Sequence, residues 1–168
     1  MNSYVLSILV KNHSGVLRRV SGLFSRRGYN IKSLSVGETE DSRISRITVV
    51  VSGDEYIVEQ ITRQVSKLIE VINIEKINSG EVFRELALIR IKTTTEMRSE
   101  IIEMINIFRA RVVDVSESSL IAEVTGDNSK VEAFIKAVEP YGILELVRTG
   151  LTAIKRGNSI ASEEKQSF

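Results

Sequence analysis

The 168-residue sequence contains no cysteine, no tryptophan, one proline and one histidine. Without cysteine the chain can form no disulfide, thiolate nucleophile or thiolate metal site. The single histidine, His13, stands beside Ser14, and adjacent side chains on a turn diverge instead of forming a nucleophile–base pair. We therefore expect neither catalytic residues nor metal ligands in this chain, and we interpret His13 as a surface loop residue.

An excess of charge of either sign is also absent. The chain has 23 Lys and Arg against 22 Asp and Glu, a formal net charge of +1. No basic field is available to attract nucleic acid or an anionic membrane over a distance. No apolar run approaches the roughly 18 to 20 residues that cross a membrane. We expect a cytoplasmic protein with no nucleic-acid or membrane partner, and the charge balance suits a small uncharged or zwitterionic ligand.

What the sequence does contain is the same series of hydrophobic patterns twice. In the first half, alternating apolar residues indicate strands and apolar stripes at spacings of three and four indicate helices. The first half is expected to form strands 3–11, 31–39, 45–52 and 71–77 and helices 15–27 and 54–68. The second half is expected to form strands 83–92, 111–117, 120–125 and 143–148 and helices 96–108 and 129–139. Both halves have the order βαββαβ.

Individual residues support this repeat. Gly53-Asp54 precedes the second helix of the first half, and Gly126-Asp127 precedes its counterpart. The two helices also place apolar residues at matching positions: Val58, Ile61, Val65 and Leu68 against Val131, Phe134, Val138 and Tyr141. The predicted fold is α+β, with two ferredoxin-like βαββαβ domains in tandem and helices on one face of each antiparallel sheet. The predicted domains are 1–79 and 80–157, followed by a polar tail, 158–168.

Each predicted sheet has a polar face and two edges. Ser33, Ser35, Thr48 and Ser52 alternate with apolar residues, so we expect the face without helices to be open to solvent. Edge strands carry unpaired backbone groups that can pair with another chain. A homodimer or a higher assembly is therefore expected.

Two turns in the first half suggest a ligand site. The run from Asn12 to Leu17 joins a strand to a helix, where backbone N–H groups and the positive end of the helix dipole suit a carboxylate. We interpret Ser14 as the helix cap, and Gly15 as a residue that lets a ligand approach the backbone. The second turn is Gly28-Tyr29-Asn30. Each turn alone is also compatible with an ordinary loop, but together they favour a ligand site.

Other functions fit less well. The βαββαβ order also occurs in RNA-recognition modules, but the corresponding strands here lack the aromatic residues on which bases stack. Glu38, Glu40 and Asp41 form an acidic cluster between two strands, which is typical of a solvated hairpin loop. General acid catalysis would instead require a partly buried carboxyl group with a perturbed pKa.

Three stretches resemble a known family. These are NHSGVLRRVSGLFSRRGYNIKSLSVG from Asn12, SRITVVVSGDE from Ser45, and FRARVVDV from Phe108. They resemble the small regulatory subunit of acetolactate synthase, whose N-terminal part is an ACT domain. The resemblance implies regulation of a catalytic large subunit, activation of that subunit, and feedback inhibition by valine or a related branched-chain amino acid. It also implies that thiamine diphosphate, Mg and FAD belong to the catalytic subunit and that this chain holds no cofactor.

The resemblance further implies that the effector binds between the ACT domains of two chains. One chain would contribute Asn12, Ser14, Gly15, Val16 and Leu17, and the other Asn30 and Ile31. The second half has Lys92-Thr93-Thr94-Thr95-Glu96-Met97 at the equivalent turn, without glycine, so no ligand site is expected there. The alternative function is a free-standing ACT-type sensor that acts on another enzyme or on a transcription factor.

Overall fold

The computed structural model describes residues 2–157, which divide into two compact units. Residues 2–82 and 151–157 form the first unit, and Phe83–Gly150 forms the second. The first unit contains β1 (Asn2–Lys11), α1 (Val16–Arg26), β2 (Ile31–Glu38), β3 (Ile44–Gly53), α2 (Glu55–Val65), β4 (Val71–Ile77) and β9 (Thr152–Ile154). The predicted tail, 158–168, lies outside the described residues.

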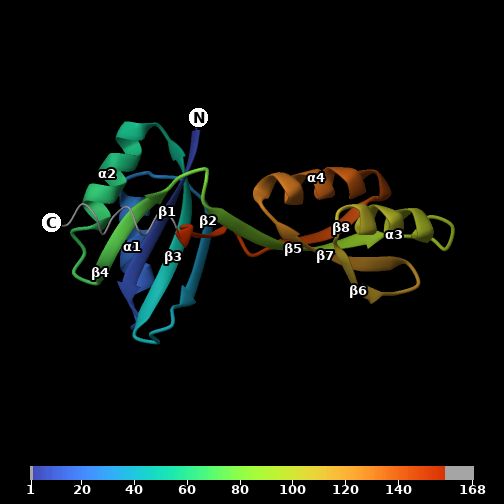
Figure 1. Ribbon diagram of the computed structural model, residues 1–168, viewed down its shortest axis with the longest axis horizontal. Coiled ribbons are helices and arrows are strands. Elements are labelled where there is room, and N and C mark those ends of the chain that lie inside the picture. The colour runs from blue at the N-terminus through green and yellow to red at the C-terminus, as the bar shows by residue number, and fades with distance from the viewer. Residues whose placement is uncertain (1, 158–168) are drawn as a thin grey trace. The chain divides into compact units, whose positions relative to one another are not determined.

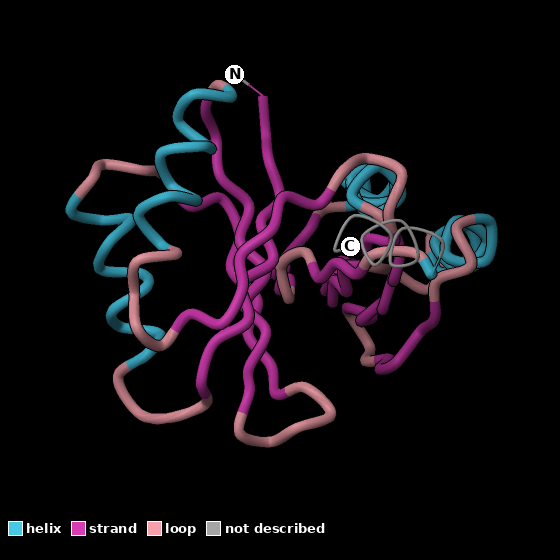
Figure 2. Tube along the Cα trace, turned by 60° about the vertical axis from the view of Figure 1, so that its left-hand side comes forward, coloured by secondary structure: helices cyan, strands magenta, loops and turns pink. Residues whose placement is uncertain are grey.

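The first unit is one antiparallel sheet with two helices on one side. Its strand order is β2-β3-β1-β4, and Figure 2 shows α1 and α2 together on the same side of these strands. The apolar stripe of α1 predicted from the sequence is buried: Val16, Val20, Leu23 and Phe24. It packs on the alternate residues of the central strands, Leu6, Ile8, Ile47, Val49 and Val51. The two hydrophobic periodicities therefore meet in one core.

The second unit repeats this arrangement. Its elements are β5 (Val82–Lys92), α3 (Arg98–Ile107), β6 (Arg111–Val115), β7 (Ser119–Gly126), α4 (Asn128–Val138), a short 3₁₀ helix (Glu139–Tyr141) and β8 (Ile143–Arg148). The strand order β6-β7-β5-β8 matches that of the first sheet. Figure 1 shows α3 and α4 beside these strands. The predicted fold class, tandem ferredoxin-like domains with antiparallel sheets, is confirmed.

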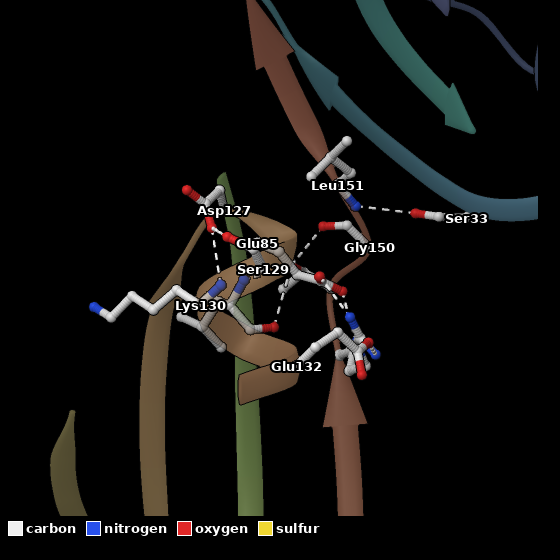
Figure 3. Close-up of polar contacts among 11 residues, drawn as sticks. Ser33, Glu85, Asp127, Ser129, Lys130, Glu132, Gly150 and Leu151 are labelled. Atoms are coloured by element: carbon white, nitrogen blue, oxygen red, sulfur yellow. Dashed lines mark hydrogen bonds and ion pairs between the residues drawn. The ribbon is translucent and has the colours of Figure 1, made fainter. Parts of the chain in front are cut away.

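The Gly-Asp pairs start the second helix of each unit, as predicted. Asp54 caps α2 by accepting a hydrogen bond from the backbone N–H of Ile57, and Asp127 caps α4 by accepting one from Lys130. Figure 3 shows the contacts of Asp127, which also accepts from the Ser129 hydroxyl at 2.6 Å. These hydrogen bonds hold the pKa of Asp127 below its usual value. The repeat therefore extends to the chemistry of the helix caps.

The prediction of a solvent-open face was wrong for the first unit. Residues 151–156, here called the strap, contact the sheet face opposite the helices. The backbone N–H of Leu151 donates to Ser33 Oγ on β2 at 2.9 Å (Figure 3), and Lys155 Nζ lies 2.7 Å from Glu75 Oε2 on β4. Ala153, in β9 between them, is only 4% exposed. The strap thus contacts Ser33, which the alternating pattern had assigned to solvent, and Thr48 on the same predicted face is only 2% exposed.

The strap also shifts the domain division. The sequence pattern predicts a second domain over 80–157, whereas the structure divides the chain after Val82 and returns residues 151–157 to the first unit. The cause is packing at long sequence separation, since the strap contacts Ser33 of β2 and Glu75 of β4.

Candidate functional site

The turn between β1 and α1 leaves backbone donors without partners. Gly15 precedes the helix in the left-handed conformation, with φ of +88°, and offers no side chain to cap it. The N–H of Val16 has a long hydrogen bond of 3.4 Å to the His13 carbonyl. Within residues 2–157, no acceptor meets the N–H groups of Leu17 and Arg18. Two free donors at the positive end of a helix form a cradle for an anion.

The interpretation of Ser14 as the helix cap was wrong. Gly15 occupies the capping position, and no side chain within the described residues donates or accepts a hydrogen bond there. Ser14 lies one residue too early for its hydroxyl to reach the N–H groups of the first turn. Its carbonyl oxygen instead lies 3.1 Å from His13 Nδ1. The hydroxyl of Ser14 therefore stays available beside the cradle.

Asn12 fixes this turn to the β2–β3 hairpin. Its backbone N–H donates to the Arg43 carbonyl at 2.6 Å. Its side-chain Nδ2 donates to Glu38 Oε1 at 2.9 Å and to the Ser42 carbonyl at 2.8 Å. All of its N–H donors are thereby directed into the chain, and of its side-chain amide only the oxygen Oδ1 remains for another group.

The hairpin that receives Asn12 is itself well ordered by polar contacts. Arg43 Nε and Nη2 contact both carboxylate oxygens of Asp41, at 2.7 to 3.1 Å. The Arg43 side chain is the main reason that the pKa of Asp41 lies below its usual value. Thr39 N–H donates to the Ile44 carbonyl and closes the hairpin. The acceptors for Asn12 therefore lie on a hairpin whose loop is held by its own hydrogen bonds.

Asn30 and Ile31 follow the opposite end of α1. Gly28, with φ of +69°, terminates the helix, and the N–H of Tyr29 donates to the Phe24 carbonyl at 3.0 Å. Asn30 is exposed, and its side chain has no hydrogen bond to another described residue. Ile31 begins β2 and packs partly against the first core.

Within one chain, the structure brings together only part of the predicted site. The residues Asn12, Ser14, Gly15, Val16 and Leu17 lie at one end of α1, whereas Asn30 and Ile31 lie at its other end. An α-helix rises about 1.5 Å per residue, so the 11 residues of α1 separate the two groups by roughly 16 Å. A single amino acid cannot contact both groups of one chain.

The equivalent turn in the second unit makes hydrogen bonds that the first turn lacks. Arg98 N–H donates to the Thr94 carbonyl at 3.1 Å, and Met97 N–H donates to Thr94 Oγ1 at 3.4 Å. Arg98 Nη2 also donates to the carbonyls of Ser116 and Glu117. The next two N–H groups of α3, those of Ser99 and Glu100, have no acceptor among the described residues, as is true of Leu17 and Arg18 in α1. The two turns differ instead in the residue before the helix, which is Gly15 with φ of +88° in the first unit and Met97 in the second. That the second turn binds no ligand stays a prediction.

Glu38 is the residue of this region whose role the sequence did not reveal. The pattern placed it in a solvated acidic cluster, but its carboxylate accepts a hydrogen bond from Asn12. Its neighbour Glu40 is exposed and has no such contact within the described residues. The two partners are 26 positions apart, so no local pattern could reveal the contact.

The fold and the open turn define a class: two ferredoxin-like domains in tandem, of which the first has the features of an ACT domain. Two family models agree. Residues 6–73 match the model described as "AHAS small subunit-like ACT domain", and residues 84–157 match "Small subunit of acetolactate synthase". The chain belongs to the family of acetolactate synthase small subunits, the regulatory subunits of that enzyme.

Individual relatives cover almost the whole chain. It is 55% identical over 155 residues to a probable acetolactate synthase small subunit of Archaeoglobus fulgidus, covering 92% of this chain and 98% of the relative. It is 51% identical over 156 residues to the acetolactate synthase small subunit of Mycolicibacterium smegmatis, covering 92% of each. The crystal structure of the small subunit from Thermotoga maritima has a TM-score of 0.86 and 42% identity, covering 93% of this chain and 98% of that one. The predicted family is confirmed.

The described part of the chain has neither a cluster of metal-ligating side chains nor a membrane-spanning helix. Within residues 2–157, no three His, Cys, Asp or Glu side chains gather closely enough to hold a metal ion. No helix in that range is long and apolar enough to span a membrane. The expectations of a chain without cofactor and of a cytoplasmic location stay predictions.

Proposed function

We propose that this small subunit activates the catalytic large subunit of acetolactate synthase and inhibits it when valine, or a related branched-chain amino acid, binds between two copies of the first domain. Thiamine diphosphate, Mg and FAD belong to the large subunit in this proposal. The small subunit supplies no group to the reaction itself. Its contribution is a binding site whose occupancy changes the activity of its partner.

The observation that carries this proposal is the separation of the two site groups along α1. The strand β2 is an edge strand that pairs only with β3 among the described strands. Two copies that pair antiparallel along β2 place the start of one β2 beside the end of the other. Because Asn12 is bound to Glu38 at the end of β2, this pairing brings Asn12 and Gly15 of one chain close to Asn30 and Ile31 of the other.

The residues so assembled suit the three parts of a branched-chain amino acid. The free N–H groups of Leu17 and Arg18 would bind the carboxylate, and Asn12 Oδ1 would accept a hydrogen bond from the ammonium group. The aliphatic side chain would pack on Leu17, which is 43% exposed, on Val36 of β2, which is 44% exposed, and on Ile31 of the other chain. Covering these exposed apolar side chains favours binding.

Calorimetric titration of the full-length protein with valine, leucine and isoleucine tests the ligand class. We expect saturable binding with one site for each chain, and activity of the reconstituted enzyme that falls as the site fills. Glycine serves as the control ligand because it has the same charged groups without an aliphatic side chain. Absence of binding by all three branched-chain amino acids would refute the proposal.

Mixing two inactive variants tests whether the site is shared. Gly15→Asp damages one half of each site and Asn30→Ala the other half, so each homodimer binds poorly. A mixed dimer has one doubly damaged site and one intact site, so random exchange restores about a quarter of the wild-type sites. No recovery of valine binding after mixing would show that each chain forms its site alone.

A further inference from the structure

We propose that Glu38 is a positioning residue that makes this site select an amino acid over the 2-oxo acid of the same carbon skeleton. The inference rests on the function proposed above and concerns the recognition of the ammonium group. Its basis is the contact between Glu38 Oε1 and Asn12 Nδ2, at 2.9 Å.

The contacts of Asn12 determine which end of its side-chain amide faces the ligand. Nδ2 has two hydrogens, and both are used, one by Glu38 and one by the Ser42 carbonyl. A flipped amide would place Oδ1 against two acceptor oxygens, which is unfavourable. The amide therefore presents Oδ1, an acceptor, away from the hairpin. An acceptor suits an ammonium group and does not suit a carboxylate or a keto oxygen.

Glu38 also leaves negative charge beside this acceptor. None of the described ion pairs includes Glu38, and the nearby guanidinium of Arg43 is occupied by Asp41. Glu38 is exposed at the end of β2, the edge along which the second chain is proposed to pair. A carboxylate one hydrogen bond away from Asn12 Oδ1 attracts a cation and repels an anion.

The two ends of the proposed site thereby attract ligand groups of opposite charge. The free N–H groups of Leu17 and Arg18 attract the ligand carboxylate, while Asn12 and Glu38 form an acceptor-only end. A 2-oxo acid satisfies the first end but places a keto oxygen against the acceptor Asn12 Oδ1 at the second. An acceptor-only end thus discriminates strongly, because the wrong ligand leaves polar groups unpaired.

Two substitutions separate the positioning effect from the charge. Glu38→Ala removes both, so Asn12 is free to rotate, and valine affinity is expected to fall about 30-fold. Glu38→Gln keeps an amide oxygen that accepts from Asn12 Nδ2, so the loss is expected to be only about fivefold. Glu40→Gln removes a charge from the same hairpin without touching Asn12, and is the matched control with unchanged affinity.

Each protein is titrated with valine and with 3-methyl-2-oxobutanoate by calorimetry. We expect the wild-type protein to prefer valine strongly, Glu38→Ala to lose most of this preference, and the weak affinity for the oxo acid to change little. Thermal unfolding midpoints confirm that each variant is folded. Partial rescue by glutamine distinguishes positioning from a general loss of structure.

The outcomes separate this inference from the proposed function. Wild-type protein that fails to bind valine refutes the proposed function and the inference with it. Wild-type protein that binds valine while Glu38→Ala binds it equally well refutes the inference alone. Equal losses of valine and oxo-acid affinity in Glu38→Ala also refute it, because Glu38 would then support the whole turn rather than the choice of ligand.

Discussion

The two domains have the same order of elements and the same sheet topology, yet their first turns differ. Both turns are fixed by the same backbone bond to the neighbouring hairpin, from Asn12 N–H to Arg43 in the first domain and from Thr93 N–H to Ser118 in the second. In the second domain Thr94 then accepts from the N–H groups that begin the helix. In the first, Gly15 precedes the helix in the left-handed conformation and no side chain caps it. The second and third N–H groups of the helix have no acceptor among the described residues in either domain.

This difference shows that the fold supplies the position and the side chains decide its use. A βαββαβ domain always presents a helix start at this edge, because the first strand must lead into the first helix. Whether that start can admit a ligand depends on the side chains beside it. In the second domain the Thr94 hydroxyl and the Arg98 side chain make hydrogen bonds at the helix start, whereas in the first domain Gly15 places no side chain there.

The largest expected effect comes from placing a negative charge in the open turn. Gly15→Asp puts a carboxylate where the ligand carboxylate is proposed to bind, so valine affinity should fall at least about 100-fold. Gly15→Asn has the same shape and the same cost of about 1 kcal/mol for the left-handed backbone, but no charge. Calorimetry of both variants isolates the charge. Equal affinities of Gly15→Asp and the wild type would place the carboxylate elsewhere.

The dependence of the first domain on the strap is tested by two truncations. A chain that ends at Gly150 lacks the strap, and a chain that ends at Gly157 keeps it. The shorter chain loses the Leu151–Ser33 hydrogen bond and the burial of Ala153, so the free energy of unfolding of the first domain should fall by about 2 kcal/mol. Hydrogen exchange, followed separately in each domain, should show faster exchange in β1 to β4 of the shorter chain only. Equal protection in the two chains would contradict this role.

The smallest effect compares the two turns directly. Thr94→Ala removes the hydroxyl that accepts from Met97 N–H, so the second domain should lose about 0.5 kcal/mol of stability while valine binding stays unchanged. Ser14→Ala removes a hydroxyl that caps nothing, so it should leave stability unchanged and weaken valine binding. Chemical denaturation and calorimetry measure the two quantities. Destabilisation by Ser14→Ala would restore the capping interpretation.

The sequence predicted the fold well because the fold depends on local periodicity. The spacing of Val16, Val20 and Phe24 requires only the helix itself, and the structure buries these residues as expected. The repeat of the Gly-Asp pairs was equally local. Features that depend on distant residues were missed: the strap has only the three residues of β9 in regular structure, and its contact with Ser33 spans 118 positions.

The candidate site was predictable only in its residue types. Asn12 and Gly15 were identified from the turn, but the direction of the Asn12 amide depends on Glu38 and Ser42, which join it through the hairpin. The error at Ser14 arose because the left-handed backbone of Gly15 starts the helix one residue later than the pattern suggests. That the residues from Asn12 to Leu17 and the pair Asn30 and Ile31 form one site stays a prediction.

The strap has a consequence for how the protein is made. A ribosome synthesises β1 to β4 first, but the strap that covers their sheet leaves the ribosome only after all of β5 to β8. The first domain to emerge is therefore the last to finish packing. During translation its Ser33 hydroxyl and Glu75 carboxylate lack the partners they have in the finished chain, so a chain that stops early yields a domain with an uncovered face.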